Sequence, residues 1–158
     1  MRRIRSAAFP ILVSILAAQV SAALADNLPK SAKPMSAGEV RAVYSGKSAV
    51  WDDARAFFAP DGGVIGYNSK EKVTFSGSWS VSSNRNCMKV AWKSTKSADS
   101  GKSSDCWQWY KDGKKIWTLW STRYDGSKPK KDDYYQGEVK SLKAGDKVSK
   151  EYAKLTKS

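Results

Sequence analysis

The stretch "CWQWYKDGKKIWTLW", residues 106–120, holds four of the seven tryptophans of the 158-residue chain. Near its middle stands Asp112-Gly113, a dipeptide favoured in the two-residue turn of a β-hairpin. Aromatic and β-branched residues flank this turn on both sides, as is typical of strands. We therefore predict a hairpin in which Lys111 pairs with Lys114 across the turn.

This register distributes the aromatic groups over two faces, because successive side chains of a strand point to opposite sides of the sheet. Trp109 would face Ile116. Trp107 would face Thr118, with Trp120 in line on the same side. The opposite side would carry the remaining residues: Cys106, Gln108, Tyr110, Lys115, Trp117 and Leu119. Aromatic groups would thus lie on both faces, of which only one can be the core.

The first 25 residues are typical of a secretory signal peptide. Arg2, Arg3 and Arg5 precede an apolar stretch at 7–18, and small residues lead to Ala25. The apolar run is short and interrupted, which disfavours a membrane span; an uncleaved anchor is the alternative. We expect cleavage near Ala25, leaving a periplasmic or secreted protein with no transmembrane segment.

The two cysteines, Cys87 and Cys106, would then reach an oxidising compartment, where a disulfide is the default. Two free thiols or a metal pair are the alternatives. Because the chain has no histidine, a structural zinc site would lack its usual ligands, and we predict neither a metal nor a cofactor. The bridge would close a loop of about twenty residues and stabilise the fold by about 3 kcal/mol.

The disulfide also helps to choose the core face. If Cys87 lies across from Cys106, Lys89 and Lys93 share the face of Gln108, and these lysines mark that face as the outer one. The inner face then collects apolar residues: Met88, Val90, Trp92, Trp107, Trp109, Ile116 and Trp120. Its indoles either pack a dense core or line a cavity in the mouth of a barrel. The candidate cavity residues are Trp92, Trp107, Trp109 and Trp120.

On the outer face, Trp117 and Tyr110 form a candidate stacking platform for a ligand. Gln108, Lys89 and Lys115 would flank it and complete a candidate binding face. The alternative is that the helix or the C-terminal tail covers Trp117 and Tyr110.

From Lys47 onward the sequence alternates with period two. Runs such as "ARAFFA", "GVIGY", "KVTFSGSWSV", "CMKVAW" and "KIWTLWSTRY" are separated by turn signals such as Pro60-Asp61-Gly62-Gly63. This pattern predicts a mainly β domain at 36–142, a small antiparallel β-barrel or sandwich of lipocalin-like type with seven or eight strands.

One short N-terminal helix precedes the strands. Ser36 and Glu39 have the spacing of a capping box, and Gly46 can end the helix, so we predict a helix at 37–45.

The remaining segments are polar. Residues 26–35 contain two prolines and are predicted to form a flexible arm. A last strand is expected around 134–142, followed by a basic C-terminal tail at 143–158 that is frayed or a weakly docked helix.

Charge points to a class of partner. The chain carries 28 Lys and Arg against 15 Asp and Glu; without the three leader arginines, 25 basic residues would remain, a net charge of +10. Such a field attracts acidic polysaccharide, envelope phosphates, nucleic acid or an acidic protein, although plain solubility is the alternative. Nucleic acid is the weaker candidate, because specific readout usually favours arginine and most of these residues are lysines.

The sequence argues against an enzyme. The commonest catalytic base, histidine, is absent, and no Gly-x-Ser-x-Gly or phosphate-binding loop occurs. The pair Ser69 and Lys72 has the spacing of a Ser/Lys dyad, which chance explains in a chain so rich in both. The acidic pairs Asp52-Asp53 and Asp132-Asp133 adjoin turns and lack the spacing of glycosidase or calcium sites. We predict no catalytic residues.

The chain resembles a family of secreted alphaproteobacterial proteins of unknown function. The resemblance covers roughly 28–120 and rests on the two cysteines together with three motifs, which are Lys33-Pro34-Met35-Ser36, Phe58-Ala59-Pro60-Asp61-Gly62 and Gly77-Ser78-Trp79. It implies export and a small disulfide-containing domain, and supplies no catalytic residues. From Gly77 to Cys106 the chain is also similar to periplasmic lipocalin-like protease inhibitors, but its helix and basic end depart from them.

Three functions follow as hypotheses. The first is a non-enzymatic exported binding protein that contacts an anionic polysaccharide or envelope surface. The second is a lipocalin-like carrier of a small apolar ligand inside the barrel. The third is an inhibitor, with a secreted or periplasmic enzyme as its protein partner.

Overall fold

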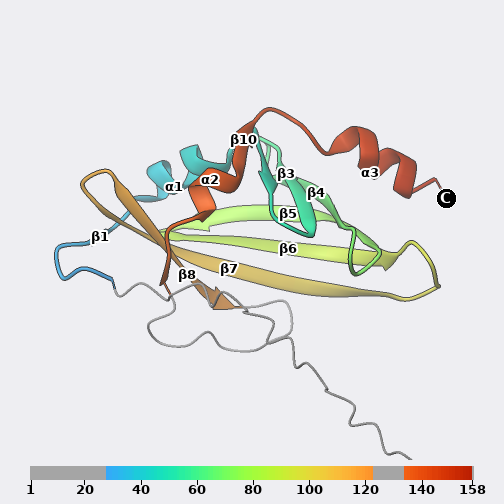
Figure 1. The fold of residues 1–158 in the computed structure, drawn as a ribbon, viewed down its shortest axis with the longest axis horizontal. Coiled ribbons are helices and arrows are strands. Elements are labelled where there is room, and N and C mark those ends of the chain that lie inside the picture. Colours follow the sequence, from blue (N-terminus) through green and yellow to red (C-terminus); the bar gives the residue numbers. More distant parts are fainter. Residues whose placement is uncertain (1–27, 123–133, 158) are drawn as a thin grey trace, which may run out of the picture.

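A computed structural model describes residues 28–122 and 134–157 (Figure 1). Ten strands form one curled antiparallel sheet in the order β10-β2-β3-β4-β5-β6-β7-β8-β9, with β1 also paired to β7. The strands are β1 (Lys33–Pro34), β2 (Lys47–Val50), β3 (Ala54–Phe58), β4 (Gly63–Asn68), β5 (Val73–Ser82), β6 (Arg85–Ser94), β7 (Ser100–Asp112), β8 (Lys115–Thr122), β9 (Tyr134–Tyr135) and β10 (Leu142–Ala144). The helices are α1 (Ala37–Tyr44), α2 (Glu138–Ser141) and α3 (Ser149–Leu155).

The predicted fold class is confirmed, and the sheet takes the form of an open half-barrel (Figure 1). Consecutive strands from β2 to β9 are neighbours, so the sheet is a meander of simple antiparallel connections. The count exceeds the predicted seven or eight strands because β1 was not expected and because β9 and β10 form where one last strand was expected. Each has two or three residues, too few to carry a period-two pattern.

The predicted N-terminal helix is confirmed as α1, together with its capping box. The Ser36 hydroxyl accepts a hydrogen bond from the Glu39 backbone N–H at 3.3 Å. The Glu39 carboxylate in turn accepts one from the Ser36 backbone N–H at 2.8 Å. Val40 and Tyr44 lie one turn apart on α1 and are fully buried, so the helix covers the inner face of the sheet.

The core beneath α1 is aromatic. The Tyr44 ring lies 4.6 Å from that of Phe58 and 5.4 Å, edge-on, from that of Trp109. Phe58 also meets Trp79 edge-on at 5.8 Å, and the Trp79 indole donates to the Ala59 carbonyl at 2.8 Å. Edge-to-face contacts of this kind add to the free energy gained from burying the rings.

The predicted hairpin forms, but its register is different. Asp112 pairs with Lys115 and Trp109 with Thr118, so the turn is Gly113-Lys114 rather than Asp112-Gly113. Gly113 has a φ of 55° and occupies the first central position, as in a type II′ turn. Because the pairing moves by one residue on each strand, no side chain changes face.

The flexible arm predicted at 26–35 needs correction in its described part. Lys33 pairs with Lys111 and Pro34 with Tyr110, and the Met35 N–H donates to the Trp109 carbonyl at 3.1 Å. β6 begins opposite Gln108, so β1 takes the place beside β7 that β6 leaves open. Met35 is buried, which anchors the segment.

The C-terminal region also differs from the prediction. In place of one strand at 134–142, the chain forms β9, the helical turn α2 and β10. β10 pairs with β2 through Ala144, so the domain extends beyond the predicted boundary at Leu142. The tail contains the predicted helix as α3, and the buried Val148 precedes it. No helix in the described ranges has the length and apolarity needed to cross a membrane.

Candidate functional site: a basic outer face

The disulfide predicted between Cys87 and Cys106 is present and joins directly opposed residues of β6 and β7, with Cα atoms 4.1 Å apart. The neighbouring residues of β6 lie on the faces that the sequence predicted. Met88 and Val90 point inward, each with 6% of its surface exposed, whereas Lys89 is exposed on the other side.

The inner tryptophans do not form one group. Trp109 is fully buried against Tyr44, and Trp107 lies in the same core cluster. Trp92 is partly exposed, and its indole lies against Gly101, where an added Cβ would come within 2.8 Å of the ring. The side chain of Trp120 is outside what the structure describes. For Trp107 and Trp109, these positions favour the packed-core alternative over the cavity.

The predicted outer binding face is not assembled. Trp117 has only 2% of its surface exposed, so its indole does not offer a stacking platform. Tyr110 is half-buried, its ring edge-on to Tyr134 at 5.7 Å. Its hydroxyl donates to Gln108 at 3.4 Å.

The two lysines of that predicted face remain exposed but lie far apart. Lys89 pairs with Ser104, whereas Lys115 pairs with Asp112 at the other end of β7. Eight residues of strand separate these partners, about 26 Å. The sequence therefore predicted correctly that Lys89 and Lys115 are exposed, but the prediction that they flank one binding face was wrong.

The structure instead brings together four cations, which we call the basic face: Arg85, Lys89, Lys93 and Lys102. The first three occupy outward positions of β6, spaced four residues apart, which is about 13 Å along a strand. Lys102 projects from β7 opposite Ala91, between the levels of Lys89 and Lys93. All four are exposed, and within the described residues none of them forms an ion pair.

A ladder of serines runs beside these cations on β5. Its members are exposed and point outward at every second residue: Ser76, Ser78, Ser80 and Ser82. Ser78 pairs with Lys89, and Ser82 pairs with Arg85. Hydroxyls that both donate and accept hydrogen bonds thus adjoin the ammonium and guanidinium groups.

Acidic groups are absent from the outward positions 76–82 of β5, 85–93 of β6 and 100–106 of β7. Asp105 lies between them in sequence but points inward and is buried. Asp99 lies in the turn beyond β6 and accepts a hydrogen bond from the Ser97 hydroxyl at 2.7 Å. Serines and cations alternate with other residues in the sequence of β5 and β6. The prediction relied on aromatic residues to locate a binding face and therefore missed these positions.

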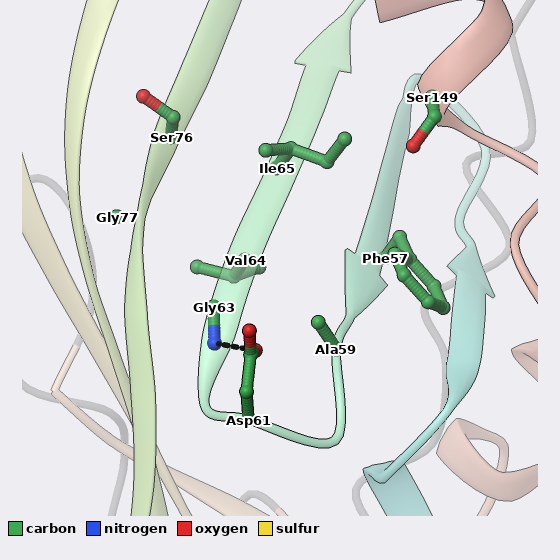
Figure 2. A pocket seen from close by; sticks show the side chains of 9 residues that line it. All are labelled: Phe57, Ala59, Asp61, Gly63, Val64, Ile65, Ser76, Gly77 and Ser149. Atoms are coloured by element: carbon green, nitrogen blue, oxygen red, sulfur yellow. Dashed lines mark hydrogen bonds between the residues drawn. The ribbon is translucent and has the colours of Figure 1, made fainter.

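A shallow pocket of about 430 Å³ adjoins the serine ladder (Figure 2). Phe57 and Ile65 form its apolar part, Ser76 lies on one side, and Ser149 of α3 lies on another. The Asp61 carboxylate at its end accepts the Gly63 N–H at 2.9 Å and so serves the turn between β3 and β4. This arrangement does not provide an opposed acid and base.

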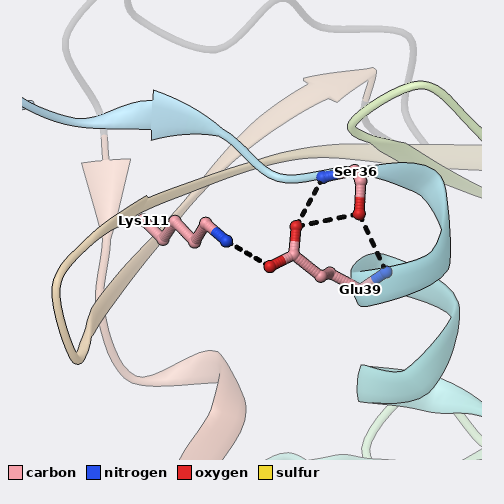
Figure 3. A network of polar contacts seen from close by, with 3 residues as sticks. All are labelled: Ser36, Glu39 and Lys111. Atoms are coloured by element: carbon pink, nitrogen blue, oxygen red, sulfur yellow. Dashed lines mark hydrogen bonds and ion pairs between the residues drawn. The ribbon is translucent and has the colours of Figure 1, made fainter.

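Lys111, by contrast, is neutralised by an ion pair (Figure 3). Its ammonium donates to the Glu39 carboxylate, which ties the central hairpin to α1. The hydrogen bond from Lys111, followed by that from the Ser36 backbone, lowers the pKa of Glu39 to about 2. The cations of the basic face lack such a partner in the described chain, so their field is open to an external anion.

The described residues considered for catalysis in the sequence lie in or beside turns. The Ser69 hydroxyl donates to the Asp53 carbonyl at 3.1 Å, and Lys72 adopts a positive φ in the same turn region. Asp52 and Asp53 are exposed, and Asp132-Asp133 falls outside the described residues. Within the described ranges, no group of three His, Cys, Asp or Glu residues could hold a metal ion.

Comparison with known proteins gives a family without an assigned activity. No curated protein and no solved structure matches the chain significantly. Residues 12–148 match the model of the family described as "Protein of unknown function (DUF995)", and the chain therefore belongs to that family.

Proposed function

We propose that this chain is a non-enzymatic exported binding protein that holds an anionic glycan or envelope surface on its basic face. The observation that carries the proposal is a set of four exposed cations that form no ion pair within the described residues and lie where the outward positions of β5, β6 and β7 carry no acid. Charges that have no internal partner are free to attract an external one.

Export is part of the same proposal. Residues 1–25 have the pattern of a signal peptide, and processing near Ala25 would place the chain in the periplasm or outside the cell. The Cys87–Cys106 disulfide supports this compartment, because disulfides persist mainly in oxidising environments.

The test is binding to an acidic polysaccharide and to lipopolysaccharide over a salt series. We expect binding at low ionic strength that weakens as salt screens the charges. K89E/K93E should abolish it, whereas K147E/K150E should not, because that pair makes the same charge change near α3. Failure to bind at low salt, or binding that is indifferent to salt, would refute the proposal.

A further inference from the structure

The outer face of β5, β6 and β7 has the geometry of a track for a chain molecule. Arg85, Lys89 and Lys93 lie on one strand, so their side chains form a line about 26 Å long. Between them stand the small residues Cys87 and Ala91. A straight row of cations over a low floor suits an extended polymer better than a single compact headgroup.

The floor of this track is polar and made of short side chains. The four serines of β5 run beside β6 from Arg85 to Ala91, each paired with a β6 residue: Ser82 with Arg85, Ser80 with Cys87, Ser78 with Lys89 and Ser76 with Ala91. Lys93, at the end of the row, pairs with the buried Thr74. Serine hydroxyls match the hydroxyls of sugar rings, since both groups donate and accept hydrogen bonds.

The same face lacks the residues that two other anionic partners require. Between positions 76–82, 85–93 and 100–106, the outward side chains are serine, cysteine, alanine, lysine and arginine. A surface that enters a lipid bilayer needs apolar side chains on the face that contacts it. Single-stranded nucleic acid is usually held by stacking on aromatic rings. Neither kind of side chain is present on these outward positions.

The disulfide makes the track rigid. It links the floor position of β6 to that of β7 between Arg85 and Lys89. A face fixed before binding loses less conformational entropy when a ligand is bound.

We infer that the basic face binds a linear, hydroxylated polyanion, an acidic polysaccharide that carries carboxylates and lies along β6 with its hydroxyls on the serine ladder. This inference rests on the proposed function and narrows it from any anionic surface to one chemical class.

The experiment compares three probes with the oxidised protein. Polygalacturonate carries carboxylates and hydroxyls, poly-L-glutamate carries carboxylates without hydroxyls, and vesicles of phosphatidylcholine and phosphatidylglycerol present an anionic membrane. We expect polygalacturonate to bind about tenfold more tightly than poly-L-glutamate, which corresponds to one or two additional hydrogen bonds. The vesicles should bind more weakly than polygalacturonate.

Variants separate the hydroxyls from the charges. S78A/S80A should remove the preference for polygalacturonate without changing net charge, and S78T/S80T should retain it because threonine keeps the hydroxyl. K89Q/K93Q should weaken binding of both polymers about tenfold, since two exposed charges of the basic face are removed. The matched control K147Q/K150Q should bind as the native protein does. Circular dichroism verifies the fold of every variant.

The outcomes distinguish this inference from the proposed function. Equal binding of the two polymers, with no effect of S78A/S80A, would overturn the polysaccharide class and leave polyanion binding intact. Tighter binding to the vesicles would overturn it in favour of a membrane surface. Absence of binding to every anionic probe at low salt would overturn both.

Discussion

The Trp51 indole, directly after β2, donates a hydrogen bond to the Glu138 carboxyl group of α2, with Nε1 3.0 Å from Oε2. The Tyr44 hydroxyl lies 3.3 Å from the other carboxyl oxygen. Glu138 has only 6% of its surface exposed, and no lysine or arginine of the described chain forms an ion pair with it. Burial therefore raises its pKa above 4.5, although the two donors oppose the shift.

This buried acid predicts a stability that falls with rising pH. The folded state holds the Glu138 proton more tightly than the unfolded state, so the group's contribution is fully present below pH 4.5. It is lost as pH rises through the folded pKa. Glu138→Gln should remove this dependence, because the amide stays neutral.

Urea unfolding of both proteins between pH 4.5 and about 8, at constant ionic strength, measures the difference. Glu71→Gln is the control, because Glu71 is exposed. Parallel stability curves for the native protein and Glu138→Gln would show that Glu138 does not titrate as the burial argument requires.

The link between Glu39 and Lys111 makes a second prediction. Lys111→Met should raise the pKa of Glu39 from about 2 toward 4.5, and the Ser36 hydrogen bonds should hold it below that value. For the native protein, stability from this carboxylate is present above pH 4.5 and is lost as pH falls toward 2. NMR titration of the Glu39 carboxyl measures the shift. Lys114→Met, in the exposed turn, should leave the titration unchanged.

Two glycines should respond in opposite ways to alanine. A Cβ at Gly77 would lie 2.1 Å from the Lys89 carbonyl oxygen, so β5 and β6 would have to separate. We expect Gly77→Ala to destabilise the protein by about 2 kcal/mol or more. At Gly38, within α1, nothing lies within 4 Å of the added carbon, and alanine should stabilise by about 0.5–1 kcal/mol.

Chemical denaturation of the two alanine variants gives both values. Similar stabilities for Gly77→Ala and the native protein would contradict the close approach of the strands.

Truncation of two tryptophans separates core from surface. Trp109→Ala should cost about 3–5 kcal/mol of unfolding free energy, because the indole is fully buried and packs edge-on against Tyr44. Trp92→Ala should cost less than half as much, because Trp92 is partly exposed. Chemical denaturation of both variants measures the two losses of unfolding free energy, provided that their m-values are equal. Equal losses for Trp109→Ala and Trp92→Ala would contradict the packing described for Trp109.

The sequence was most informative where the signal was local. The capping box at Ser36 and Glu39 predicted α1, and alternation on either side of Cys87 and Cys106 predicted which face is buried. Each of these depends on contacts within one element or between adjacent strands, and alternation has a fixed period.

Non-local features were missed for physical reasons. The turn residue Gly113 suits two turn types, and sequence alone does not choose between them. The docking of β1 depends on where β6 begins, a position far along the sequence from β1. The basic face and the serine ladder beside it depend on the register among β5, β6 and β7, and the sequence alone does not give this register.

Lysine footprinting tests most directly that the basic face is the binding site. The protein is treated with an acetylating reagent in the presence and absence of polygalacturonate at low salt, and the modified lysines are quantified by mass spectrometry. The account predicts protection of Lys89, Lys93 and Lys102, while Lys147 and Lys150 react equally in both samples. Bound polymer that leaves the three lysines as reactive as before, or protects only those near α3, would contradict it.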